Sequence, residues 1–128
     1  MADDDSIRSY RDLRVWNEAM ELAAECYQVT KAFPREEMFG MTSQIRRAGA
    51  SVPANIAEGY GRESSGSYVH FLKNAQGSLK EVETHVLLAV KVELISSETA
   101  MPVLDRAETV GKMLRGLIRS IPQGGAAS

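Results

Sequence analysis

Apolar residues recur along this chain at alternating intervals of three and four, which is the spacing of one face of an α-helix. Four long segments carry the pattern, and short polar stretches separate them. In the first segment, residues 12–31, the apolar line consists of Leu13, Trp16, Met20, Ala23, Tyr27 and Thr30. A half-buried strand would alternate with a period of two, so the pattern argues against a sheet protein and predicts an all-α fold.

The other three segments repeat the same spacing. Residues 37–61 carry the inner line Met41, Ile45, Ala48, Val52 and Ile56. Residues 68–95 carry the inner line Leu72, Ala75, Leu79, Val82, Val86 and Ala89. The last segment, which ends at residue 121, carries the inner line Leu104, Ala107, Gly111, Leu114, Ile118 and Ile121. Because short connections force neighbouring helices to run antiparallel, we expect an up-down-up-down four-helix bundle.

Proline and serine residues predict where these helices bend and begin. Pro53 lies in the middle of the second segment, where it removes a backbone hydrogen bond and crowds the carbonyl of Gly49. We therefore expect this helix to be kinked near Pro53. Serines in the polar stretch 61–67 and at Ser96 supply N-caps for the following helices. Because the first of these turns is centred near residues 64 and 65, facing residues of that hairpin should have numbers that sum to about 129.

Length and charge describe a single, nearly neutral domain. One core is enough for 128 residues, and we expect residues 10–121 to form the bundle, residues 1–9 a flexible acidic leader and residues 122–128 a flexible tail. No apolar run follows the acidic start, so we expect a cytoplasmic protein with no membrane contact. Three of the 17 acidic residues lie in the leader, which leaves 14 against 15 basic residues. A near-neutral bundle lacks the strong positive field of a non-specific nucleic-acid binder.

The residue patterns of metal centres, nucleotide-binding loops and covalent catalysis do not occur in this sequence. His70 and His85 stand outside any metal-ligand spacing. Cys26 lies among apolar residues, which favours a packed thiol over a nucleophile. We therefore expect no enzyme activity, no metal, no cofactor and no small-molecule substrate.

The last helix carries charges that have two interpretations. A single stripe contains Asp105, Glu108, Lys112, Arg115 and Arg119. Its basic end has the composition of a phosphate-binding patch. We favour a structural interpretation, since acids near a helix N-terminus and bases near its C-terminus complement the helix dipole.

Two helices are apolar on more sides than one bundle covers. In the second segment, no residue from 48 to 57 is charged, and Ala50, Ala54 and Ala57 form a line of small residues that faces away from the core. On the third helix, Leu88, Val92 and Ile95 lie well away from the inner line. Apolar surfaces of this size are covered in soluble proteins, so we expect these two sets to form the interface of a homo-oligomer.

Four runs of sequence resemble a known family: Tyr10–Trp16, Phe33–Ala48, Ser51–Arg62 and Ala75–Glu83. They look like the four-helix-bundle proteins encoded within intervening sequences of bacterial 23S ribosomal RNA genes, which are often labelled S23 ribosomal proteins. The Asn-Ile-Ala-Glu-Gly sequence at 55–59, with its upstream proline, is the most specific part. The family is similar in fold to the accessory variability determinant of diversity-generating retroelements, a pentameric bundle that binds nucleic acid and a reverse transcriptase. The resemblance thus implies five copies and no catalytic residues.

Polar residues flank the second and third helices and leave the function open. The candidates are Arg46, Arg47, Asn55, Glu58, Arg62, Ser78 and Glu81. They suit either a nucleic-acid surface or a polar network that fixes helix register or a subunit contact, with Arg47 level with Glu81 or Glu83. The retroelement relative is strongly basic, whereas this chain is not. Two functions therefore remain: an oligomeric module that binds RNA or DNA weakly at low salt, and a scaffold whose only partners are proteins.

Overall fold

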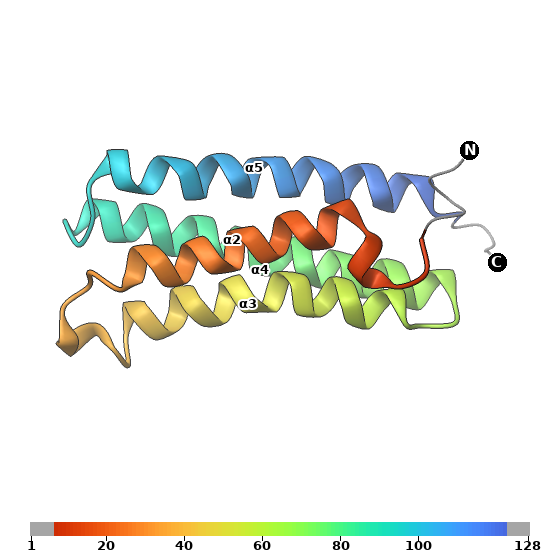
Figure 1. Cartoon of the computed structure of the whole chain (residues 1–128), viewed down its shortest axis with the longest axis horizontal. Helices are drawn as coiled ribbons and strands as arrows, with labels where there is room; N and C mark the ends of the chain where they lie inside the picture. Colours follow the sequence, from red (N-terminus) through yellow and green to blue (C-terminus); the bar gives the residue numbers. More distant parts are fainter. Residues whose placement is uncertain (1–6, 123–128) are drawn as a thin grey trace.

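Four long helices run back and forth along one axis in the computed structural model, which describes residues 7–122 (Figure 1). The helices are α2 (Arg14–Thr30), α3 (Met41–Tyr60), α4 (Ser65–Lys91) and α5 (Ser97–Ser120). Short 3₁₀ helices, η1 (Tyr10–Asp12) and η2 (Arg35–Glu37), precede α2 and α3. The described residues contain no strand, so the all-α prediction is confirmed. The predicted leader and tail, apart from residues 7–9 and 122, lie outside the described residues.

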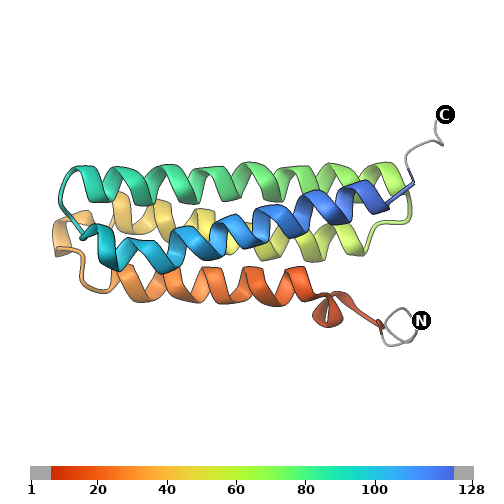
Figure 2. The ribbon, with the colours of Figure 1, turned by 90° about the horizontal axis from the view of Figure 1, so that it is seen from above.

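Each long helix packs against two others. Helix α3 contacts α2 and α4, and α5 contacts the same two helices, so the four axes surround a single core (Figure 2). Within residues 7–122, every helix is too short or too polar to span a lipid bilayer.

The core confirms the predicted inner lines of α3 and α4. Ile45, Ala48, Val52 and Ile56 are buried in α3, and the whole predicted line of α4 from residue 72 to residue 89 is buried. These helices each have only one continuous line of larger apolar residues at the right spacing, so the pattern determines which side is buried.

The predicted inner line of α2 is wrong at Met20 and Tyr27, which are exposed, whereas Thr30 is buried as predicted. The other predicted residues are partly buried: Leu13, Trp16 and Ala23. The residues that fill the core are Val15, Ala19, Leu22 and Cys26. Helix α2 carries two interleaved apolar lines, and the line with smaller residues lets the neighbouring helices approach closely. The line with Trp16 and Tyr27 stays at the surface, where their polar atoms meet water.

Helix α5 also departs from its predicted line. Ala107 and Leu114 are buried as expected, but the line continues through Ala100, Val103 and Val110. The other predicted residues, Leu104, Gly111, Ile118 and Ile121, are partly buried at the edge of the core. The inner line is thus shifted by one residue at Val103 and Val110, towards the β-branched side chains.

Serine side chains cap two helices as predicted. Ser64 Oγ accepts a hydrogen bond from the backbone N–H of Ser67, and Ser96 Oγ accepts one from that of Thr99, each at 3.1 Å. Helix α4 starts at residue 65, earlier than expected, and ends at residue 91, before the expected residue 95. It ends because Glu93 has a φ of 68°, a left-handed conformation that stops a helix.

The α3–α4 hairpin has the predicted register. Ser51 Oγ and Ser78 Oγ are hydrogen-bonded at 2.7 Å, and their residue numbers sum to 129. Helix α3 begins at residue 41 instead of residue 37, because residues 35–37 form η2. It continues without a break through Pro53, and the kink at that residue stays a prediction.

Candidate functional site

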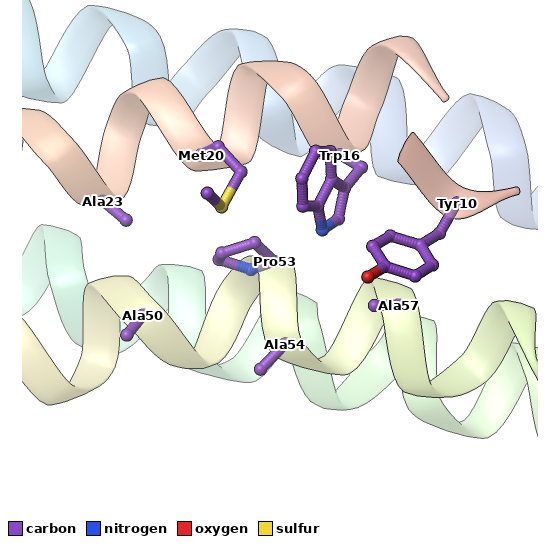
Figure 3. A pocket seen from close by; sticks show the side chains of 8 residues that line it. All are labelled: Tyr10, Trp16, Met20, Ala23, Ala50, Pro53, Ala54 and Ala57. Atoms are coloured by element: carbon purple, nitrogen blue, oxygen red, sulfur yellow. The ribbon is translucent and has the colours of Figure 1, made fainter. Parts of the chain in front are cut away.

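An apolar groove runs along the outer side of the α2–α3 pair (Figure 3). Its volume is about 390 Å³. One bank consists of Tyr10, Trp16, Met20 and Ala23, and the other of Ala50, Pro53, Ala54 and Ala57. The three alanines are the small-residue line that we expect at an interface. Ala50 and Ala54 are exposed and Ala57 is partly buried.

The end of the groove at Tyr10 is built by a capped 3₁₀ turn. Ser9 Oγ accepts a hydrogen bond from the N–H of Arg11, and Asp12 Oδ2 accepts bonds from the N–H groups of Arg8 and Ser9. This capping box holds η1 against the bundle. The Tyr10 ring then packs edge-on against Trp16, with the ring centroids 5.1 Å apart. The aromatic end of the groove is therefore pre-formed.

The floor of the groove exists because α2 and α3 approach closely at Gly49. A Cβ atom at Gly49 would lie 3.0 Å from Cys26 Sγ, so only glycine fits this contact without a shift. The thiol is fully buried, and burial followed by the nearby charge of Glu25 raises its pKa to about 12. Cys26 is therefore a packing residue that stays protonated at neutral pH, as its apolar neighbours in the sequence predicted.

A second apolar surface lies near the end of α4. Leu88 and Val92 are 42% and 55% exposed, whereas Ile95 is partly buried and packs against the core. Leu87 on α4 is exposed as well, and so is Phe39, a residue that sequence reasoning missed, which is 92% exposed in the connection before α3. One signal for Phe39 is present in the sequence, namely its position in a short stretch between a proline and a glycine.

Several of the polar candidates form bonds within the chain. The Nε–H of Arg46 donates to Thr30 Oγ1 at 2.8 Å, and its guanidinium lies 4.7 Å from the centroid of the Tyr27 ring. Asn55 Nδ2 donates to the carbonyl oxygen and to the Oγ of Ser51, which in turn bonds Ser78. These contacts tie α3 to both of its neighbours.

The remaining polar candidates lie on the surface. Arg62, two residues after the end of α3, pairs with Glu58 of that helix at 2.6 Å and lies over the Phe71 ring. Arg47 and Glu81 are exposed, and neither forms an ion pair within residues 7–122. Among the candidate arginines, Arg47 is therefore the one whose side chain has no partner in the described part of the chain.

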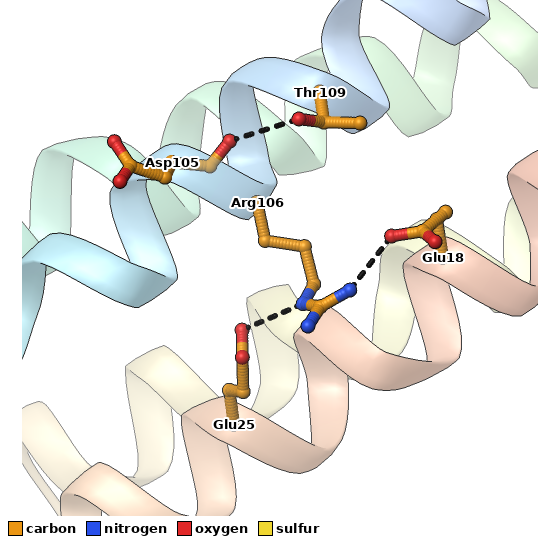
Figure 4. Close-up of polar contacts among 5 residues, drawn as sticks. All are labelled: Glu18, Glu25, Asp105, Arg106 and Thr109. Carbon is orange, nitrogen blue, oxygen red and sulfur yellow. Dashed lines mark hydrogen bonds and ion pairs between the residues drawn. The ribbon is translucent and has the colours of Figure 1, made fainter.

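A charged cluster joins α5 to α2 (Figure 4). Arg106 Nη1 contacts Glu18 Oε1 at 2.7 Å, and its Nε–H donates to Glu25 Oε1 at 3.0 Å. The hydrogen bond to Glu25 is the largest cause that raises the pKa of Arg106. The guanidinium satisfies both carboxylates, so this cluster is a cross-link between helices. In residues 7–122 there is no group of three or more histidine, cysteine or acidic side chains placed to hold a metal ion.

Comparison with known proteins decides the family. The family model described as 23S rRNA-intervening sequence protein matches residues 11–116. The chain belongs to this family. Among solved structures, a protein of unknown function from the S23 ribosomal protein family of Bacteroides thetaiotaomicron superposes with a TM-score of 0.73 and 25% sequence identity. The match covers 81% of this chain and 97% of that chain. No curated protein matches the sequence.

The match to the 23S rRNA-intervening sequence protein family includes most of the site. The α3 bank of the groove, the polar flank and the Arg106 cross-link all lie within residues 11–116, and Tyr10 lies immediately outside. The resemblance seen in the sequence is thereby confirmed as family membership, with the helical bundle that it implied.

Proposed function

We propose that this member of the family is a non-enzymatic, cytoplasmic module that assembles with copies of itself. The observation that supports the proposal is the exposed apolar groove between α2 and α3. Its two banks present aromatic and aliphatic carbon on one side and alanines on the other. Contiguous apolar surface of this kind on a soluble protein marks a place where another surface binds.

The second apolar surface supports a contact between copies. Leu88 and Val92 lie on α4, whereas the alanine bank lies on α3, so the two surfaces are different patches of one molecule. A contact between two different patches is head-to-tail, and repeated copies then close into a ring when the rotation permits. The resemblance to the pentameric retroelement protein indicates five copies.

Light scattering after gel filtration tests the assembly. Five copies of a 14.0 kDa chain give a particle of about 70 kDa. A wild-type protein that runs at 14.0 kDa when its concentration is on the order of 10 µM would contradict the proposal.

A charged side chain placed in the proposed subunit interface should prevent assembly. Ala54→Lys introduces an ammonium group into the alanine bank, and the expected result is a folded monomer, because burying an unpaired charge is costly. Ala32→Lys is the matched control, since Ala32 is exposed in the connection after α2. A second variant, Leu88→Lys with Val92→Lys, tests the α4 surface separately. If both groove and α4 variants keep the wild-type mass, these surfaces do not form the interface.

The alternative function is nucleic-acid binding through the polar candidates on the flank of α3 and α4. Arg46 and Arg62 already bond inside the chain, which favours the scaffold interpretation for that flank. Labelled RNA and duplex DNA, titrated at about 50 mM salt into wild type and Arg47→Gln, test the remaining cation. Equal binding by the two proteins would remove this flank from consideration.

A further inference from the structure

A second groove lies between α4 and α5, on a different seam of the bundle from the apolar groove. It has a volume of about 300 Å³ and is lined by Gln76, Gly77, Leu79, Lys80, Gly111 and Arg115. Lys80 comes from α4 and Arg115 from α5, so a cation stands on each bank. The floor between them is largely glycine and leucine.

The groove is lined by two stretches of sequence that contain no acidic residue. Residues 64–80 and 109–122 contain no aspartate or glutamate, and the fold brings these two stretches side by side. They carry the cations Lys73, Lys80, Lys112, Arg115 and Arg119. Lys80 pairs with Glu83 and Lys112 with Glu108, each partner lying beyond the acid-free stretch. Within the described residues, Lys73, Arg115 and Arg119 have no ion-pair partner. The five cations therefore come from two acid-free stretches that meet at this groove, although the chain as a whole is nearly neutral.

Helix-dipole stabilisation explains only half of this charge. Bases in the last turns of α5 complement its negative end, which accounts for Arg115 and Arg119. The helix dipole gives no such stabilisation to Lys73 and Lys80, because both lie in the interior of α4, more than two turns from either end. Lys73 has no ion-pair partner among the described residues, and Lys80 has only an exposed pair with Glu83, so both lysines are available to an anion outside the chain.

Gly77, on the α4 bank of this groove, is not required by contacts inside the protein. A Cβ atom at Gly77 would meet nothing within 4 Å, although glycine within a helix costs up to about 1 kcal/mol relative to alanine. At Gly111 a Cβ would lie 3.3 Å from Leu79 Cδ2, the end of a flexible side chain. Small residues here leave both helix backbones accessible from the groove.

We propose that the α4–α5 groove binds the phosphodiester backbone of a nucleic acid. Lys80 and Arg115 contact phosphate oxygens from opposite banks, and Gly77 and Gly111 let the sugar-phosphate chain lie close to the helices. Lys73 and Lys80 are two turns apart on α4, about 10 Å, and Arg115 and Arg119 are one turn apart on α5. Two rows of cations suit a polymer with a charge on every repeating unit. The inference does not depend on self-assembly, since one chain contains the whole groove.

Fluorescence anisotropy with a labelled single-stranded RNA of about 20 nucleotides tests this site at about 50 mM salt. The double variant Lys80→Gln with Arg115→Gln should bind the RNA at least about 10-fold more weakly than wild type. The slope of log affinity against log salt concentration should also become shallower by about two, since two phosphate contacts are lost. The matched control, Lys31→Gln with Arg35→Gln, removes the same charge at the opposite end of the bundle and should change affinity less than about 2-fold. Light scattering checks that both variants keep the wild-type mass.

The groove itself is tested by a pair of variants at one position. Gly77→Glu and Gly77→Gln have side chains of the same size, and neither meets another atom at Cβ. The glutamate should weaken RNA binding well beyond the glutamine, because it places an acid between the two banks. Equal affinity in the two variants would show that the ligand does not enter the groove.

Competitors identify the class of ligand. Unlabelled single-stranded DNA should displace the RNA, while polyglutamate of equal charge and inorganic phosphate at about 1 mM should displace little. Displacement by polyglutamate as strong as by DNA would assign the groove to an acidic protein, and complete displacement by phosphate would assign it to a small anion. Either result, or a wild type that does not bind RNA, overturns the proposal. Because the mass of the wild type is measured separately, such a failure leaves the assembly proposal standing.

Discussion

Helix α3 and helix α5 are held in the bundle in different ways. The backbone of α3 nearly touches both neighbours: a Cβ at Gly59 would lie 2.8 Å from Phe71 Cβ on α4, and one at Gly49 would lie 3.0 Å from Cys26 Sγ on α2. Helix α5 packs through side chains such as Val103, Val110 and Leu114 and is joined to α2 by Arg106, and a Cβ at Gly116 would meet nothing within 4 Å. Glycine is thus required by packing at residues 49 and 59 of α3, whereas packing does not require it at residue 116 of α5.

The difference indicates that stability is unevenly distributed. Close backbone contacts are rigid, whereas long, partly exposed side chains reorganise at little cost. We therefore expect α5 to open locally before α3 and α4 do. The side with spare glycines is also the side with the unexplained cations, which separates the part of the molecule that maintains the fold from the part available to a ligand.

The largest effect should come from filling the tightest contact. Gly59→Ala places a methyl group against Phe71 Cβ and the backbone oxygen of Tyr68, neither of which moves easily. We expect the free energy of unfolding to fall by about 2–3 kcal/mol, measured by urea denaturation. Gly116→Ala is the control on the open side and should not destabilise the protein. A Gly59→Ala variant as stable as wild type would show that the α3–α4 contact is looser than described.

High pH should weaken the α2–α3 contact through Cys26. The unfolded thiol ionises near pH 9, whereas burial raises the folded pKa to about 12, so this group does not affect stability below pH 9 and costs stability as pH rises from 9 towards 12. At pH 10.5 the loss should be about 2 kcal/mol relative to pH 8. Urea denaturation gives the free energy of unfolding of wild type and of Cys26→Ala at each pH. The difference between the two pH profiles isolates the contribution of the thiol. Parallel curves for the two proteins would mean that the folded thiol ionises normally.

Removing the cross-link of α5 should have a smaller effect. Arg106→Ala leaves Glu18 and Glu25 without their common partner, but the Arg106 side chain is 31% exposed and water screens the pairs. We expect a loss of about 1 kcal/mol. Hydrogen exchange should accelerate in α5 more than in α3. Equal acceleration in both helices would contradict the proposed difference between the two sides.

The smallest effect should be an increase in stability. Gly77→Ala replaces a helical glycine that has open space around it, and stability should rise by about 0.5–1 kcal/mol because the unfolded chain loses freedom. Thermal denaturation detects this change as a higher melting temperature. A lower melting temperature would reveal an internal requirement for glycine at this position.

The sequence predicted the α3–α4 hairpin well because one apolar line continues along most of each helix, whereas their other apolar residues form short or small-residue lines, and serines mark the turn. It failed for α2, where two apolar lines compete and only the fit against Gly49 decides that Ala19 and Cys26 face inward. That error concealed the groove, since Trp16 and Met20 were assigned to the core and only the alanine bank was predicted. The cations of α4 and α5 are distant in sequence, and only the packing of these helices brings them to one groove.

The two acid-free stretches lie at the same end of the bundle, where α4 begins and α5 ends (Figure 1). In a ring with cyclic symmetry the copies are related by rotation alone, so their α4–α5 grooves repeat at one level around the axis. A long polymer that passes around the ring meets several equivalent grooves, and each groove after the first is filled at a high local concentration. Avidity would then favour long chains over short fragments, with no change in the chemistry of a single groove.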